Sequence, residues 1–159
     1  MLKEINWTSL IICIAIPLVA GTLSGLANVN SINGWYSTLN KPSFNPPNYL
    51  FGPVWTLLYI LMGISLYLVV QTTKSDLRST ALIIFSGQLL LNFSWSFAFF
   101  YFQSPVIALV IIIAMLIGIV LMILYFFRLS YTAAYLQIPY LLWVSFATVL
   151  NGAVWYLNK

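Results

Sequence analysis

Residues 105–127 read PVIALVIIIAMLIGIVLMILYFF, and this stretch decides the class of fold. No polar side chain interrupts it between Val106 and Leu124. A helix of this length rises about 35 Å, which is more than the roughly 30 Å thickness of the hydrocarbon core of a bilayer. The stretch therefore predicts a membrane-spanning helix, and its uniform apolarity predicts a lipid-facing wall.

The composition of the whole chain agrees with a membrane protein. Of the 159 residues, 62% are apolar and only 5% are charged, whereas a typical soluble domain is about 25% charged. The charged residues leave long uncharged segments between them, and Gln103-Ser104-Pro105 divides the longest of these into two. The prediction is an all-α, polytopic bundle of five transmembrane helices, forming one domain over residues 1–159. The predicted spans are residues 7–27, 53–71, 80–102, 105–127 and 132–157.

The start of the chain allows a second interpretation. Lys3 followed by an apolar run to Gly21 is also compatible with a signal peptide. No secreted body follows this run, which favours a first membrane span. The single cysteine, Cys13, lies within that span and excludes a disulfide framework within one chain.

The basic residues predict the orientation in the membrane. With five spans, Lys3, Lys74, Arg78 and Arg128 fall on one side, and Lys41 and Lys159 fall on the other. This excess predicts a cytoplasmic N-terminus. Because the basic residues are few and lie at membrane boundaries, we expect no nucleic-acid partner. The chain shows no recognisable transit signal, so a bacterial cell membrane is the expected location.

The one long connection, residues 28–52, is rich in proline. Pro42, Pro46 and Pro47 exclude a continuous helix there. Loops of this length are usually functional lids or disordered linkers, and disordered linkers are poor in aromatic residues. This loop has five, and they favour a packed lid: Trp35, Tyr36, Phe44, Tyr49 and Phe51.

Three spans carry polar or aromatic side chains at helical spacing. In the third span, Gln88, Asn92, Trp95 and Phe99 follow one another at intervals of 4, 3 and 4, so they share one helix face. Amides in hydrocarbon need partners, and this face should look into the bundle. The fifth span repeats such a pattern with Tyr140, Trp143, Ala147 and Asn151, and the second with Trp55, Tyr59, Met62 and Leu66.

These faces predict an aromatic pocket in the membrane half under the proline-rich loop. Ala147 beside Trp143 would leave room for a flat ligand. Two plainer interpretations compete with a pocket: tryptophans form belts at membrane interfaces, and interior amides hold helices together.

The residue inventory excludes several kinds of chemistry. The chain has no histidine, and its only carboxylates, Glu4 and Asp76, lie outside the predicted spans. A Ser-His-Asp triad, a paired-carboxylate site and a histidine-based metal or haem site are therefore excluded. We expect no cofactor and no metal. Binding by shape, stacking and a few hydrogen bonds remains, as in pockets for planar apolar ligands.

Several blocks of the sequence resemble the translocator protein family, also called tryptophan-rich sensory proteins (TspO/MBR). The resemblance rests on WYSTLNKPSFNPP at residues 35–47, FGPVWTLLY at 51–59, and the set Gln88 to Asn92, Trp95-Ser96 and Phe99-Phe100. It continues through PYLLW at 139–143, Phe146-Ala147 and Leu150-Asn151.

The resemblance implies a five-helix membrane protein, commonly a homodimer, with a pocket under the first loop. It implies binding of porphyrins and of synthetic isoquinoline or benzodiazepine ligands, and for some members of sterols. Trp55 and Trp143 correspond to tryptophans implicated in light-dependent breakdown of protoporphyrin. The chain departs from many bacterial members in having Ser37 where they have an acidic residue. The ligand-binding set carried over is Trp35, Trp55, Tyr59, Asn92, Trp95, Trp143, Ala147 and Leu150.

The leading hypothesis is thus a membrane receptor or carrier that binds protoporphyrin IX or a similar planar hydrophobic molecule. Lys41 would pair with a propionate or simply be solvated. Porphyrin transport and light-dependent degradation through Trp55 and Trp143 are the further roles considered. The alternatives are a transporter of small, sterol-like hydrophobic solutes and a structural bundle with an incidental pocket. A sterol-recognition pattern occurs only as Leu150-x5-Tyr156-x2-Lys159.

Overall fold

The computed structural model describes residues 5–159, and within them every regular element is a helix. Lys3 and Glu4, which entered the charge pattern, lie outside the described residues. Along the chain the elements are α1 (Trp7–Asn33), α2 (Trp35–Thr38), α3 (Asn48–Val70), α4 (Asp76–Ser96), the π-helical segment η1 (Phe97–Tyr101), α5 (Pro105–Phe127), α6 (Tyr131–Tyr135) and α7 (Ile138–Leu157).

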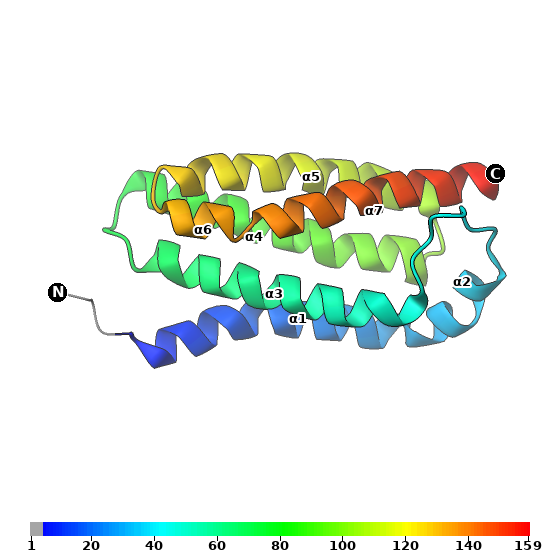
Figure 1. The fold of residues 1–159 in the computed structure, drawn as a ribbon, viewed down its shortest axis with the longest axis horizontal. Helices are drawn as coiled ribbons and strands as arrows, with labels where there is room; N and C mark the ends of the chain where they lie inside the picture. The colour runs from blue at the N-terminus through cyan, green and yellow to red at the C-terminus, as the bar shows by residue number, and fades with distance from the viewer. Residues whose placement is uncertain (1–4) are drawn as a thin grey trace.

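Five segments are long and apolar enough to cross a membrane, as predicted from the sequence. They run side by side along the long axis of the molecule, and the start of α1 and the end of α7 lie at opposite ends of the bundle (Figure 1). The segments are Trp7–Leu26, Asn48–Val70, Asp76–Tyr101, Pro105–Phe127 and Tyr131–Leu157. The protein is an integral membrane protein of the all-α class.

Polar side chains set where several helices begin. The Asn6 side chain accepts a hydrogen bond from the backbone N–H of Ser9 at the start of α1. Ser75 and Ser104 do the same at the starts of α4 and α5. These caps pair backbone donors that the first turn of a helix leaves free.

The expected connection over residues 28–52 is mostly helical, which corrects its predicted bounds. Helix α1 continues to Asn33, α2 follows after Gly34, and α3 begins at Asn48, so the one irregular segment is residues 39–47. No proline or glycine interrupts the chain between Asn28 and Asn33, and nothing there stops α1. The three prolines do keep residues 42–47 out of any helix.

Helix α5 presents an exposed apolar face, as a lipid-facing wall would, on one side only. One side of it is fully buried, including Ile112, Met115 and Ile119, while Val110 and Ile117 are exposed. The buried side packs on α4 and on α7. Because every side chain is apolar, the sequence carries no contrast that would reveal which side faces protein.

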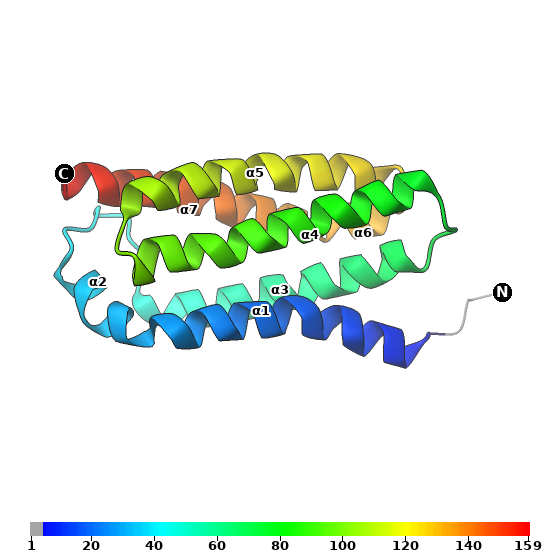
Figure 2. The ribbon, with the colours of Figure 1, turned by 180° about the vertical axis from the view of Figure 1, so that it is seen from behind.

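Helix α1 packs mainly on α3, while α4 and α7 pack on α5 (Figure 2). Gly63 makes the α1–α3 contact possible, since a Cβ at this position would overlap the backbone of Ile14. Small residues allow such close approach of helices in membranes.

The irregular segment 39–47 is tied to the end of α7. The Asn158 side chain accepts a hydrogen bond from the Asn40 N–H and donates one to the Asn40 carbonyl oxygen, each at 2.9 Å. Phe44 meets Phe146 of α7 edge-on at 6.3 Å between ring centroids. These contacts, which we call the Asn158 clamp, hold the segment across the end of the bundle.

Candidate ligand-binding site

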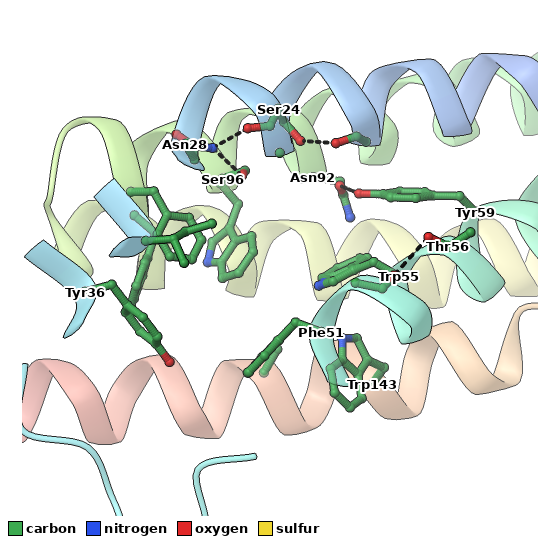
Figure 3. A pocket seen from close by; sticks show the side chains of 18 of the residues that line it. Ser24, Asn28, Tyr36, Phe51, Trp55, Thr56, Tyr59, Asn92, Ser96 and Trp143 are labelled. Carbon is green, nitrogen blue, oxygen red and sulfur yellow. Dashed lines mark hydrogen bonds between the residues drawn. The ribbon is translucent and has the colours of Figure 1, made fainter. Parts of the chain in front are cut away.

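A cavity of about 360 Å³ lies at the end of the bundle that carries α2 and the Asn158 clamp. Its walls come from α1, α2, α3, α7 and the junction of α4 with η1 (Figure 3). This volume lies within the range of roughly 300–1,000 Å³ typical of small-molecule pockets. No charged side chain is among its lining residues in the described part of the chain.

Aromatic rings form the middle of the cavity wall. Trp55 stacks on Tyr59 with ring centroids 5.5 Å apart and an interplanar angle of 26°. Trp95 lies 6.2 Å from Trp55, and Trp143 contacts Phe51 edge-on at 5.9 Å. The cavity therefore presents several ring faces and edges on which a flat apolar molecule could stack.

A chain of hydrogen bonds runs from the cavity wall into the core. Tyr59 donates to Asn92 Oδ1 at 2.8 Å, and Asn92 Nδ2 donates to the Tyr140 hydroxyl at 3.0 Å. Tyr140 in turn donates to Gln88 Oε1 at 2.9 Å. All four side chains are buried. The chain joins α3, α4 and α7 and fixes which end of the Asn92 amide faces each helix.

A second set of hydrogen bonds holds Trp95. Its indole N–H donates to Asn151 Oδ1 at 3.0 Å, and Asn151 Nδ2 donates to the Pro105 carbonyl oxygen at 2.8 Å. Asn151 thereby links α4, α5 and α7 at the edge of the cavity. The indole ring of Trp95 is thus oriented before any ligand arrives.

Small residues also line the cavity, and their short side chains leave open space beside the aromatic rings. Gly21 of α1 lies directly against the Tyr59 ring, and a Cβ there would overlap it. Ala147 of α7 is buried and also lines the cavity. Larger side chains at either position would take up cavity volume.

At the α2 end, Tyr36 lines the cavity, and its hydroxyl donates to Asn45 Oδ1 at 3.1 Å. Burial raises the pKa of Tyr36, while the Asn45 hydrogen bond opposes that shift. The Lys41 Nζ lies 4.6 Å from the centre of the Tyr36 ring. The nearest positive charge of this loop therefore sits behind a lining residue and outside the cavity itself.

The structure brings together seven of the eight residues predicted to bind ligand. Trp35 is the exception, because it lies outside the lining and packs edge-on against Phe99 at 5.7 Å. Of the five aromatic residues expected to pack as a lid, Phe44 and Tyr49 are exposed. The seven that line the cavity are Trp55, Tyr59, Asn92, Trp95, Trp143, Ala147 and Leu150.

Sequence reasoning missed the wall supplied by α1. Gly21, Ser24 and Asn28 all line the cavity, and their spacing of 3 and 4 could have indicated one helix face. Asn28 Nδ2 donates to the Ser24 carbonyl oxygen at 2.6 Å and to Ser96 Oγ at 2.8 Å. This bridge joins α1 to α4 just before η1 begins.

The residues of the site carry no charge in the described part of the chain. Within residues 5–159, no group of three or more histidine, cysteine, aspartate or glutamate residues gathers as a metal site would require. Stacking, shape and hydrogen bonds are what its residues offer. Residues 13–157 match the sequence model of the TspO/MBR family.

The chain belongs to the TspO/MBR family. This TspO/MBR protein is 43% identical over 151 residues to the tryptophan-rich protein TspO of Chlorobaculum tepidum, covering 94% of this chain and 96% of that protein. It is 42% identical over 156 residues to the tryptophan-rich protein TspO of Archaeoglobus fulgidus, covering 96% and 99%. The human translocator protein is 37% identical over 126 residues, covering 78% and 77%. The family predicted from the quoted motifs is thus confirmed.

Proposed function

We propose that this membrane protein is a receptor or carrier for porphyrins, with protoporphyrin IX or a similar planar hydrophobic molecule bound in the cavity. The observation that carries the proposal is the grouping of Trp55, Trp95 and Trp143 around an uncharged cavity within the bundle. A flat macrocycle suits stacking on such rings, and stacked aromatic pairs contribute about 0.5–1.5 kcal/mol beyond burial. Membership of the family supports the same ligand class.

The polar edge of a porphyrin would lie toward α2. Propionate groups are costly to bury without a partner, and the cavity lining offers no charge. Lys41 is the cation closest along the chain to α2, and its Nζ lies against the ring of Tyr36. In the proposed complex the propionates face Lys41 and solvent while the macrocycle lies among the tryptophans.

Tryptophan-fluorescence quenching by protoporphyrin IX, in detergent and in the dark, tests the proposal. We expect saturable quenching of the native protein and an affinity about tenfold weaker in Ala147→Phe, because the added ring fills the cavity. Val149→Phe is the matched control, since Val149 lies on the same helix and is exposed. Non-saturable quenching that is equal in all three proteins would contradict the proposal. Such a result would favour the structural bundle with an incidental pocket, and saturation by a sterol alone would favour the sterol-like transporter.

A second candidate function is light-dependent oxidation of the bound porphyrin by dioxygen. Its support is that Trp55 and Trp143 both line the cavity, where an excited porphyrin would meet their indoles. The doubly substituted protein Trp55→Phe, Trp143→Phe should still quench through its remaining tryptophans but lose product formation under light. An unchanged rate of porphyrin loss in that variant would refute this function.

A further inference from the structure

A second hollow lies on the side of the bundle formed by α1, α3 and α4. It has room for about 560 Å³ and is lined almost wholly by apolar side chains. We call it the lateral groove. It shares no lining residue with the candidate ligand-binding site. Its lining is Cys13, Ile16 and Ala20 of α1, Leu66 and Val70 of α3, and Leu82, Phe85, Ser86, Leu89, Leu90 and Phe93 of α4.

The lining of the groove along α4 is about as long as one leaflet of the hydrocarbon core is thick. On α4 its lining runs from Leu82 to Phe93, which is about 16 Å along a helix. Half of a hydrocarbon core roughly 30 Å thick is about the same length. Val70, which lines the groove, is the last residue of α3. Helix α3 ends at the end of the bundle where α1 and α4 start (Figure 2). The lining therefore extends from near this end toward the middle of the bundle.

A guanidinium lies at the α3–α4 connection, and Arg78, which carries it, stands one helical turn before the first α4 residue of the groove lining. Arg78 precedes Leu82 by four residues, so the two share one face of α4. Arg78 Nη1 donates to the Thr72 carbonyl oxygen at 2.8 Å, which holds the side chain at the α3–α4 turn. A guanidinium has five N–H donors, and the carbonyl takes one. Asp76, two residues earlier, lies on the opposite side of the helix.

We propose that the lateral groove is a binding site for a glycerophospholipid, with one acyl chain in the groove and the phosphate on Arg78. The apolar lining suits a hydrocarbon chain. The length of the lining along α4 suits an acyl chain that spans one leaflet. Arginine recognises phosphate through paired, charge-assisted hydrogen bonds. Lys74, exposed in the same turn, adds a second positive charge at headgroup level. This site is independent of the proposed porphyrin cavity.

Native mass spectrometry of the delipidated protein in detergent tests this site. The probes are phosphatidylglycerol and a diacylglycerol with the same two acyl chains and no phosphate. We expect the native protein to retain one phosphatidylglycerol and little diacylglycerol. Arg78→Gln removes the cation and Ala20→Phe fills the groove, and each should lower the bound fraction about tenfold.

Two matched variants serve as controls. Arg128→Gln removes a charge from the α5–α6 connection, away from the groove, and Val149→Phe adds a ring on an exposed part of α7. Both should bind phosphatidylglycerol like the native protein. Equal retention of the two probes would overturn the proposal, and so would an equal loss of phosphatidylglycerol in Arg128→Gln and Arg78→Gln. The proposal would also be overturned if a second copy of the chain, and no lipid, occupied the groove. Because Arg78→Gln leaves the groove lining intact, a folding defect of Ala20→Phe does not remove the test.

Discussion

Asn92 uses both ends of one amide to connect three helices around the cavity. Its oxygen accepts from Tyr59 of α3, and its nitrogen donates to Tyr140 of α7. Within the membrane, such groups have no water to replace a lost partner. Asn92 therefore contributes to the stability of the bundle and to the orientation of the Tyr59 ring beneath Trp55.

Replacing Asn92 with leucine should lower the free energy of unfolding by about 1–3 kcal/mol. Leucine keeps the number and branching of the side-chain heavy atoms, whereas the Tyr59 and Tyr140 hydroxyls each lose a partner. Thermal unfolding in detergent, followed by circular dichroism, measures the effect. Ser86→Ala is the control, because Ser86 is exposed and its hydroxyl bonds only the Leu82 carbonyl of its own helix. Equal melting temperatures for all three proteins would show that the chain of hydrogen bonds is not stabilising.

At this scale, spacing along one helix predicted Asn92, Trp95 and Trp143 as inward-facing, and all three line the cavity. It could not predict the partners, because a hydrogen bond between Asn92 and Tyr140 depends on how α4 and α7 are placed relative to each other. Asn28 escaped notice for a different reason. It falls within the loop that the sequence predicts, where an amide needs no buried partner, whereas in the structure it lies in α1 and is fully buried.

Among the helices, the contact of α1 with α3 depends on the absence of a side chain at Gly63. A Cβ at Gly63 would overlap α1 at Ile14 and come within 2.8 Å of the Cys13 carbonyl oxygen. Backbone atoms cannot rotate away as a side chain can. The two helices would have to separate, and α1 supplies one wall of the cavity.

Gly63→Ala should therefore destabilise the bundle by about 1–3 kcal/mol and weaken ligand binding. Gly87→Ala is the matched substitution on α4, where a new Cβ meets nothing within 4 Å. Since alanine is the better helix former by about 1 kcal/mol, Gly87→Ala should keep or raise stability. Unfolding by a denaturing detergent compares the two. The opposite order of stabilities would show that the α1–α3 contact is looser than described.

Element boundaries were predictable where a proline or cap marks them. The expected span over residues 105–127 coincides with α5, which starts at Pro105 after the Ser104 cap. The π-helical turn of η1 had no such signal, since Phe97–Tyr101 contains neither proline nor glycine and follows α4 without a break. The break between α6 and α7 at residues 136–137 does carry a signal, because Gln137 precedes α7 and Pro139 stands in its first turn. The predicted span over residues 132–157 ran through this break. The π-helical turn, by contrast, has no local signal in the sequence.

For the whole molecule, the five spans put the two groups of basic residues at opposite ends of the bundle. Lys74, Arg78 and Arg128 lie in or beside the α3–α4 and α5–α6 connections, whereas Lys41 and Lys159 lie near the α2 end. The cytoplasmic position of the first group, and the dimer expected from the family resemblance, stay predictions. Of these two predictions, the orientation can be tested by a single labelling experiment.

A membrane-impermeant maleimide should distinguish the two ends in intact cells. In a Cys13→Ser background, Tyr49→Cys lies at the α2 end, where Tyr49 is exposed, and Ser75→Cys lies in the exposed α3–α4 connection. With the N-terminus in the cytoplasm, Tyr49→Cys reacts from outside, and Ser75→Cys reacts only after the cells are permeabilised. The reverse pattern would invert the topology, and the Cys13→Ser protein alone gives the background.

Through the Asn158 clamp, the residue that follows α7 helps to hold the irregular segment 39–47 in place. Asn158 lies 118 residues from Asn40, yet their amide and backbone groups hold one another as two neighbouring strands would. A reporter or purification tag fused directly after Lys159 would therefore pull on the segment that runs between α2 and α3. A fusion before Trp7 is at the other end of the bundle. Protein engineering on this scaffold should therefore include a flexible spacer after Lys159. Without it, a tag would load the clamped segment and alter the ligand exchange that is being measured.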